Sequence, residues 1–246
     1  AGGQTEVTTG WFAGFALGFE DARYDATDGL SNSEGDTFYA GLSAKREIGK
    51  WLVSGAVVGS YGRFDIRRQV TAPGNIVTAT ATSDLATIGA RGRVAYTLDN
   101  GLGYIRPSAQ IDVIHTHAGG YTERDAGLFN LKVASRDQTA LVATPSVEIG
   151  ARYNAPDGLS TRIFARGGVS LSTDDGWTTV AGLSAGLPGS GTFNTELPAP
   201  DVLGRVAMGL HLMNLSSGLD LRAEYGGSFG KDYSAHGGML RLSMDF

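Results

Sequence analysis

The chain has 246 residues, of which 41% are apolar, with a net charge of −5 and no cysteine. The negative charge argues against nucleic acid as a partner, and no apolar run approaches the roughly 20 residues of a membrane-spanning helix. Mean hydropathy is −0.07, which fits a soluble protein and a transmembrane barrel equally well, because barrel strands alternate apolar and polar residues.

The N-terminal part begins without a pattern and then alternates. Residues 1–9 predict a flexible lead-in, and residues 10–246 are predicted to form one barrel domain. In the first strand Trp11, Phe15 and Phe19 share a face with the other odd-numbered residues, and the intervening residues are mostly small. The same period of two predicts three further strands in this half of the chain, near 37–47, 51–63 and 88–96.

The C-terminal part continues the alternation. Strands are predicted near 105–113, 141–153, 163–171, 202–212, 219–229 and 239–246. Pro107 lies inside the first of these, where proline normally argues against a strand. The strand is still predicted, because the alternation on both sides of the proline is long.

The links between these ten strands differ in length. Short links are predicted near 48–50, 99–101, 154–158 and 214–218. They alternate with long links near 20–36, 65–84, 116–137 and 174–200, and the last link, 230–235, is of moderate length. Tight turns at one end, long loops at the other and an even strand count are the topology of an outer-membrane barrel. The fold class is therefore predicted as all-β, a transmembrane antiparallel up-and-down β-barrel with ten strands.

Each predicted strand has an apolar and a polar face. A soluble barrel would turn the apolar face inward, and the alternation alone permits this, but the one-sided distribution of long links favours a membrane barrel with its charges inside. Aromatic residues near strand ends, such as Trp51 and Tyr61, are typical of interfacial girdles. The predicted lumen lining consists of Lys45, Glu47, Arg91, Arg93, Arg106, Asp112, Glu148, Arg152, Arg162, Arg166, Arg205, Asp220, Arg222, Glu224, Arg241 and Asp245.

The last strand ends in a C-terminal aromatic residue. Leu240, Leu242, Met244 and Phe246 fall on one face. The hairpin from Gly218, with the sequence GLDLRAEY, and the terminal Phe246 resemble the C-terminal β-domain of autotransporters, the type V secretion proteins of Gram-negative bacteria. The segments FAGFALGF, YAGL and SVEIGARY are similar to strands of that family, and the resemblance covers the whole chain.

This resemblance implies a translocator domain in the outer membrane that supports export and surface display of its own N-terminal passenger. The long loops would be extracellular and the C-terminus periplasmic. The implied partners are the lipid bilayer, periplasmic chaperones and the barrel-assembly machinery, which would recognise the strand ending in Phe246. The family's barrel usually has twelve strands and a pore helix, so two strands and a helix upstream are one alternative to a ten-stranded barrel.

Two other functions remain open from the residues. His115, His117, Asp174 and Asp175 are predicted at the outer rim, where ten-stranded omptin proteases carry Asp and His residues that activate water. A stand-alone porin-like channel is the second alternative. The sequence contains no nucleophile elbow, phosphate-binding loop or metal-spaced cluster, so neither catalysis, a metal nor a cofactor is predicted.

Overall fold

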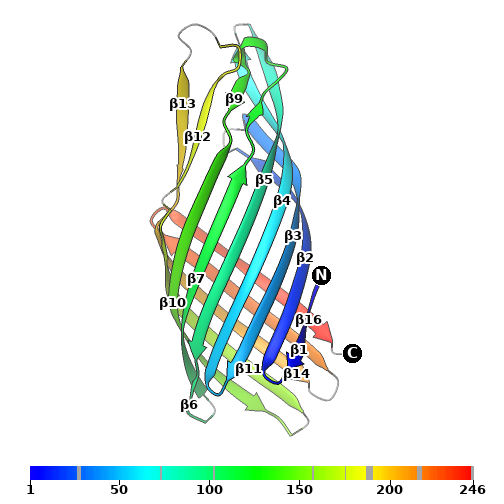
Figure 1. Ribbon diagram of the computed structural model, residues 1–246, viewed down its shortest axis with the longest axis vertical. Coiled ribbons are helices and arrows are strands. Elements are labelled where there is room, and N and C mark those ends of the chain that lie inside the picture. Colours follow the sequence, from blue (N-terminus) through cyan, green and yellow to red (C-terminus); the bar gives the residue numbers. More distant parts are fainter. Residues whose placement is uncertain are drawn as a thin grey trace.

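The structure is a computed structural model that describes residues 1–26, 29–72, 74–101, 103–156, 158–174, 176–186, 191–214 and 218–244. Its main feature is a curled antiparallel sheet that forms a tall, tilted barrel, with long strands rising above one end (Figure 1). The strands of this sheet are β1 (Gly2–Thr8), β2 (Trp11–Asp25), β3 (Ser31–Ile48), β4 (Trp51–Ala72), β5 (Asn75–Tyr96), β6 (Leu98–Asp99), β7 (Gly103–Ala118), β10 (Arg136–Asn154), β11 (Leu159–Ser172), β14 (Val202–Asn214), β15 (Leu219–Gly230) and β16 (Tyr233–Met244).

The barrel sheet is an up-and-down meander. Its strands follow one another in the order β1-β2-β3-β4-β5-β7-β10-β11-β14-β15-β16, and β6 pairs with β7 beside this path. The ten predicted strands correspond to β2, β3, β4, β5, β7, β10, β11, β14, β15 and β16. The all-β barrel is therefore confirmed. No helix in the described part of the chain is long and apolar enough to cross a membrane.

The apolar side chains lie on the outside of the barrel. Phe19 is 69% exposed and Leu240 is 74% exposed, whereas the carboxylate residue Glu148 is only 1% exposed. Phe19, Phe38 and Tyr61 are aligned partners across β2, β3 and β4, which places three aromatic residues at one level of the outer face. A second aromatic level lies near the short turns, where the Trp51 and Tyr96 rings are 4.7 Å apart. We call the outward-facing belt between these two levels the apolar band.

Residues 1–9 are not the flexible lead-in that the sequence predicts. Gly2–Thr8 forms β1, which pairs antiparallel with β2, and the backbones of Ala1 and Leu17 exchange two hydrogen bonds of 2.7 Å. Gly2 and Gly3 permit this close approach, since a Cβ at Gly2 would lie 2.6 Å from the Phe15 carbonyl oxygen. Pairing with a neighbouring strand therefore orders a segment that has no amphipathic pattern of its own.

The long links also contain regular structure. β4 and β5 are 22 residues each and pair continuously up to Ala72 and Asn75. Two other links contribute a four-stranded sheet with the order β13-β12-β9-β8, in which β8 is Tyr121–Thr122, β9 Leu131–Val133, β12 Gly176–Leu183 and β13 Thr192–Pro198, and a short 3-10 helix, η1, covers Gly127–Phe129. These strands project beyond the level at which β14, β15 and β16 end (Figure 1). They do not face lipid, so their sequences need no continuous apolar face.

Pro107 lies within β7, as predicted. The ladder between β5 and β7 ends at the pair Ala95 and Ser108, and β7 resumes pairing with β6 at Ile105. Pro107 therefore sits in the gap between two ladders on that side, where the missing N–H removes no ladder hydrogen bond.

Candidate functional site in the barrel lumen

Glu148 of β10 is the centre of the most tightly paired cluster in the lumen. Register explains the cluster, because Glu148 lies opposite Arg106 of β7 and Arg166 of β11. Arg166 Nε donates a hydrogen bond of 3.2 Å to Glu148 Oε2, and Arg106 Nη1 is 3.7 Å from Glu148 Oε1. Arg162 also donates to this carboxylate. One buried carboxylate is thus surrounded by three guanidinium groups, so it is fully compensated while positive charge remains in excess.

Tyr104 orients this cluster. Its hydroxyl donates to Glu148 Oε1 at 2.7 Å and accepts from Arg162 Nε at 2.7 Å. The tyrosine ring lies over Gly150, where an added Cβ would come within 2.5 Å of ring atoms. The sequence interpretation missed Tyr104 because only charged residues were assigned to the lumen. Its position two residues before Arg106 on the same strand face could have identified it.

A second chain of polar contacts follows the lumen wall from strand to strand. Arg91 Nε donates to Asp112 Oδ1 at 2.5 Å, and these residues are register partners on β5 and β7. Ser170 accepts a hydrogen bond of 2.9 Å from Arg205, whose other nitrogen Nη1 donates to Ser228 at 2.8 Å. The contacts connect β5 with β7 and β11 with β14 and β15, and two hydroxyl pairs at 2.8 Å, Ser108–Ser146 and Thr144–Ser170, join these groups through β10. The polar wall therefore runs over six consecutive strands.

Two cavities show that the lumen is hollow between these contacts. One, of about 450 Å³, is lined by Arg91, Arg93, Asp112, Arg166, Arg205 and neutral residues. The other, of about 430 Å³, is lined by eight basic and three acidic side chains, namely Lys45, Lys50, Arg93, Arg106, Arg152, Arg162, Arg166, Arg222, Glu47, Asp99 and Glu148. Arg93 and Arg166 line both cavities, which join the two into one strongly basic interior.

In the described structure the remaining predicted lumen residues make no hydrogen bond or ion pair with Glu148. Asp220 contacts His211 Nε2 at 2.7 Å, and Glu224 accepts a hydrogen bond of 2.5 Å from Arg222. Arg241 lines a different cavity, of about 820 Å³, beside the N-terminal residues of β1. Leu240, Leu242 and Met244 face outward and are at least 55% exposed. Asp245 and Phe246 lie outside the described residues.

The predicted rim residues do not form a catalytic pair. His115 and His117 share the outward face of β7 with Ile111, and their ring nitrogens contact Thr139 and Asp137 at 2.8 Å. Asp174 instead accepts a hydrogen bond from Gln138, whose side chain lies on the opposite face of β10 from that of Asp137. Asp175 lies outside the described residues. The histidines and Asp174 are therefore on different sides of the wall. Among the described residues, no group of three or more His, Asp or Glu side chains could hold a metal ion.

Comparisons with known proteins give a consistent family. The model of the family described as Autotransporter beta-domain matches residues 1–226. Esterase EstA from Pseudomonas aeruginosa and Esterase EstA from Pseudomonas putida are each 22% identical over 250 residues, covering 100% of this chain and 38% of each relative. The chain thus spans less than two-fifths of the length of these curated relatives.

Among solved structures, the translocator domain of autotransporter NalP from Neisseria meningitidis is similar in fold. The TM-score is 0.74 at 16% sequence identity, and the alignment covers 100% of this chain and 79% of that chain.

Proposed function

Because the chain belongs to the autotransporter β-domain family and is an outer-membrane translocator domain, we propose that it supports export of an N-terminal passenger and anchors it at the cell surface. The observation that carries this proposal is the basic lumen. Eight basic side chains and three acidic ones surround a single cavity, while the outside of the barrel is apolar. A wall of this kind can hold a polar polypeptide segment in water and shield it from lipid.

The excess of arginine suggests what the lumen binds. Guanidinium groups that have no carboxylate of their own in the wall can donate to the carboxylates of a threaded segment. An acidic face on the segment that connects passenger and barrel would fit this lining. The proposed mechanism is conformational, with passage of the chain coupled to barrel assembly and without any bond-forming chemistry.

The proposed orientation places the projecting hairpins outside the cell and the C-terminus in the periplasm. The support is the asymmetry of the barrel, because β4, β5, β12 and β13 extend beyond one end only (Figure 1). A barrel inserted from the periplasm has to move only those hairpins across the lipid. Periplasmic chaperones and the barrel-assembly machinery are the proposed partners during this insertion.

A fusion experiment tests export. A reporter preceded by a signal peptide is joined to Ala1, and its surface display is measured with an antibody on intact cells. Single cysteines at Ser108 and Ser146 should crosslink to a stalled reporter segment, because both side chains lie on the lumen face of the wall, with their hydroxyl oxygens 2.8 Å apart. A matched cysteine at Ile111, which is 56% exposed on the outer face, should not. Display without any lumen-specific crosslink would contradict passage through the barrel.

Phe246 is proposed as the assembly signal, and this remains a prediction. Phe246→Asp should reduce insertion into the outer membrane, because the last strand has to be recognised and paired before its backbone enters lipid. Phe193→Asp in β13 is the matched control, since that aromatic residue is also exposed but lies in the projecting sheet. The readout is the heat-modifiable folded band on a cold gel. Equal loss of the band in both variants would rule out a special role for the C-terminus.

The protease alternative has a separate test. His115→Ala combined with Asp174→Ala should leave surface display unchanged and abolish no peptidase activity of the purified barrel. Cleavage of peptides that depends on these two residues would replace the proposed function with a catalytic one.

A further inference from the structure

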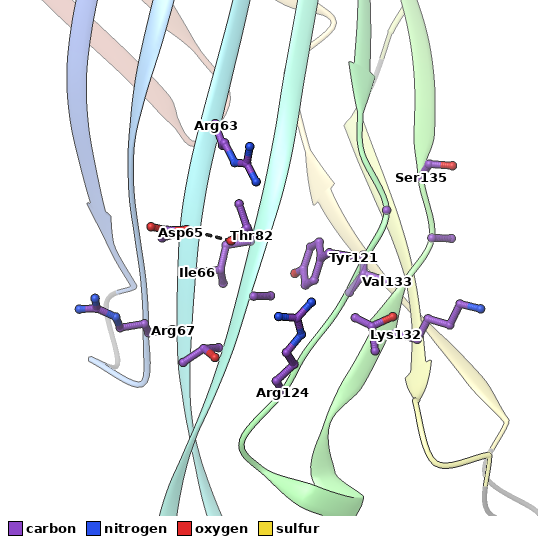
Figure 2. Close-up of a pocket in the computed structure, with 15 residues that line it drawn as sticks. Arg63, Asp65, Ile66, Arg67, Thr82, Tyr121, Arg124, Lys132, Val133 and Ser135 are labelled. Carbon is purple, nitrogen blue, oxygen red and sulfur yellow. Dashed lines mark hydrogen bonds between the residues drawn. The ribbon is translucent and has the colours of Figure 1, made fainter.

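A large cavity lies outside the lumen. It has a volume of about 1130 Å³ and lies between the projecting β4–β5 hairpin and the segment that carries β8 and β9 (Figure 2). Pockets that bind small ligands have volumes of about 300 to 1,000 Å³. The cavity therefore has room for a ligand of at least that size.

The walls of this cavity are held by specific contacts. Gly119 N donates to Asp84 O at 2.8 Å, and further up Thr80 and Arg124 exchange backbone hydrogen bonds of 2.9 and 3.0 Å. Between these two connections the chain leaves β5 and opens the cavity. Glu123, which is 4% exposed, accepts hydrogen bonds from Arg68 Nε at 2.8 Å and from Leu131 N at 2.7 Å. The opening is thus a built feature of the fold.

The cavity is basic, and in the described part of the chain its cations make no side-chain hydrogen bond to a carboxylate. Its charged lining residues are Arg63, Asp65, Arg67, Arg124 and Lys132. Arg63 makes only a long, exposed ion pair, in which its Nε is 4.0 Å from Asp84 Oδ1 and beyond hydrogen-bond distance. Within the part of the chain that the structure describes, the side chain of Arg124 has no hydrogen-bond or ion-pair partner. Figure 2 shows Arg63 and Arg124 approaching the space around Thr82 and Tyr121 from opposite ends, whereas Arg67 and Lys132 point away. Two guanidinium groups are therefore available for an anion.

The uncharged groups suit a hydroxylated ligand. Asp65 accepts a hydrogen bond of 2.9 Å from Thr82 and retains lone pairs for further donors. Tyr121 provides a half-buried aromatic surface with a polar tip. The Tyr121 hydroxyl is protonated at neutral pH and can donate a hydrogen bond, and burial raises its pKa further. An aromatic face, a carboxylate acceptor and hydroxyl groups are together suited to a saccharide.

The cavity lies close to the level of the membrane surface. Arg63 follows Tyr61 by two residues and lies on the same outward face of β4. Two residues of a strand span about 7 Å, so the guanidinium lies just beyond the aromatic level that marks the interface. In the proposed orientation this is the level of the head groups of the outer leaflet.

We propose that this cavity binds a phosphorylated saccharide, and that the ligand is the head group of a glycolipid in the outer leaflet. Arg63 and Arg124 donate to the phosphate, while Asp65, Thr82 and Tyr121 contact the sugar. The choice of the lipid as source rests on the orientation proposed above, whereas binding of the saccharide itself does not.

Binding is measured with the folded full chain in neutral phosphatidylcholine vesicles. The probe is the bisphosphorylated diglucosamine of lipid A, used as the free sugar, as its dephosphorylated form and in the acylated form within the vesicles. The free bisphosphate should bind and the dephosphorylated sugar should bind at least about tenfold more weakly, because charge-assisted hydrogen bonds are lost. The acylated form should bind more tightly than the free sugar.

Two double variants with the same change in charge locate the site. Arg63→Ala/Arg124→Ala should weaken binding of the free bisphosphate by at least roughly tenfold. Arg23→Ala/Lys231→Ala removes two exposed cations at the same end of the barrel but away from the cavity, and it should leave affinity unchanged. Equal losses in both variants, or no phosphate dependence, would overturn the site. Unchanged affinity on acylation would overturn the lipid source. An unchanged heat-modifiable band, which reports folding independently of export, is required of each variant.

Discussion

On the lumen side of the barrel wall, behind the apolar band, Glu148 is 1% exposed and contacts three arginines, whereas in the projecting hairpin Arg63 and Arg67 have carboxylates no nearer than 3.9 Å. Charged side chains are thus closely paired in one region and nearly unpaired in the other, although both regions consist of antiparallel strands. Within the membrane a carboxylate must face inward and be compensated, because neither lipid nor a packed wall solvates it. Beyond the membrane water solvates the face of the hairpin that carries Arg63 and Arg67, and exposed ion pairs of this kind contribute little to stability. The surroundings of each region, lipid or water, therefore decide whether a charged side chain contributes to stability.

Removal of Glu148 should give the largest effect. Glu148→Ala leaves three guanidinium groups around an empty site, and loss of one partner of a buried ion pair costs about 3 to 5 kcal/mol. Glu148→Gln keeps the volume and separates the effect of charge from that of packing. The free energy of unfolding is measured by denaturant titration in lipid vesicles. Glu34→Ala, whose side chain is 50% exposed and lies 3.9 Å from Arg67 of the projecting hairpin, should cost no more than about 1 kcal/mol. Equal costs for Glu148 and Glu34 would remove the distinction between the two kinds of charge.

Introduction of arginine on the outer face should give the next largest effect. Ile111→Arg places a cation in the apolar band and should destabilise the barrel by about 2 to 4 kcal/mol. Ile76→Arg, at a residue that is 62% exposed on the projecting hairpin, should change the free energy of unfolding by less than about 0.5 kcal/mol. Val147→Arg and Leu210→Arg should behave like Ile111→Arg. If Ile76→Arg were as harmful as Ile111→Arg, the hairpin would have to be within the lipid.

Loss of Glu123 should act locally. Glu123→Ala removes the acceptor that holds Arg68 and the Leu131 amide, so the segment 119–135 should exchange its amide hydrogens faster. The barrel strands should keep their protection, because local opening does not require global unfolding. Glu196→Ala in β13 is a matched control, since that side chain is exposed and no hydrogen bond or ion pair to it is described. Loss of protection in β7 and β10 after Glu123→Ala would show that the projecting region and the barrel unfold together.

The sequence predicts the apolar band much better than the region above it. In strands such as β7 and β16, apolar and polar residues alternate because only one face meets lipid. The requirement for apolar residues at every second position appears in the sequence as a period of two. The projecting parts of β4 and β5 do not face lipid, so Arg67 and Thr80 carry no signal of their pairing. The Pro73-Gly74 dipeptide is the only local indication of a tight turn there, and such a dipeptide is also found in loops.

The lumen was predicted by its charges and only in part by its geometry. Strand parity places Arg106, Glu148 and Arg166 on one face, but the register that makes them neighbours depends on pairing between distant segments. Tyr104 was missed because the predicted lining contained charged residues only, whereas its hydroxyl contacts both Glu148 and Arg162. The cavity beside Tyr121 could not be predicted, because it forms where the chain leaves β5 between two backbone connections. No periodicity marks such a departure.

Cysteine scanning tests the inside-out assignment most directly, because the chain has no cysteine of its own. Single cysteines replace Ser108, Gln110 and Asp112 on one face of β7, and Ala109, Ile111 and Val113 on the other. Labelling of the vesicle-inserted barrel with a membrane-impermeant maleimide is compared with quenching by a lipid-phase nitroxide. Maleimide should react at positions 108, 110 and 112, and the nitroxide should quench probes at positions 109, 111 and 113. The reverse pattern, or equal labelling of both sets, would contradict a hydrated lumen behind an apolar wall.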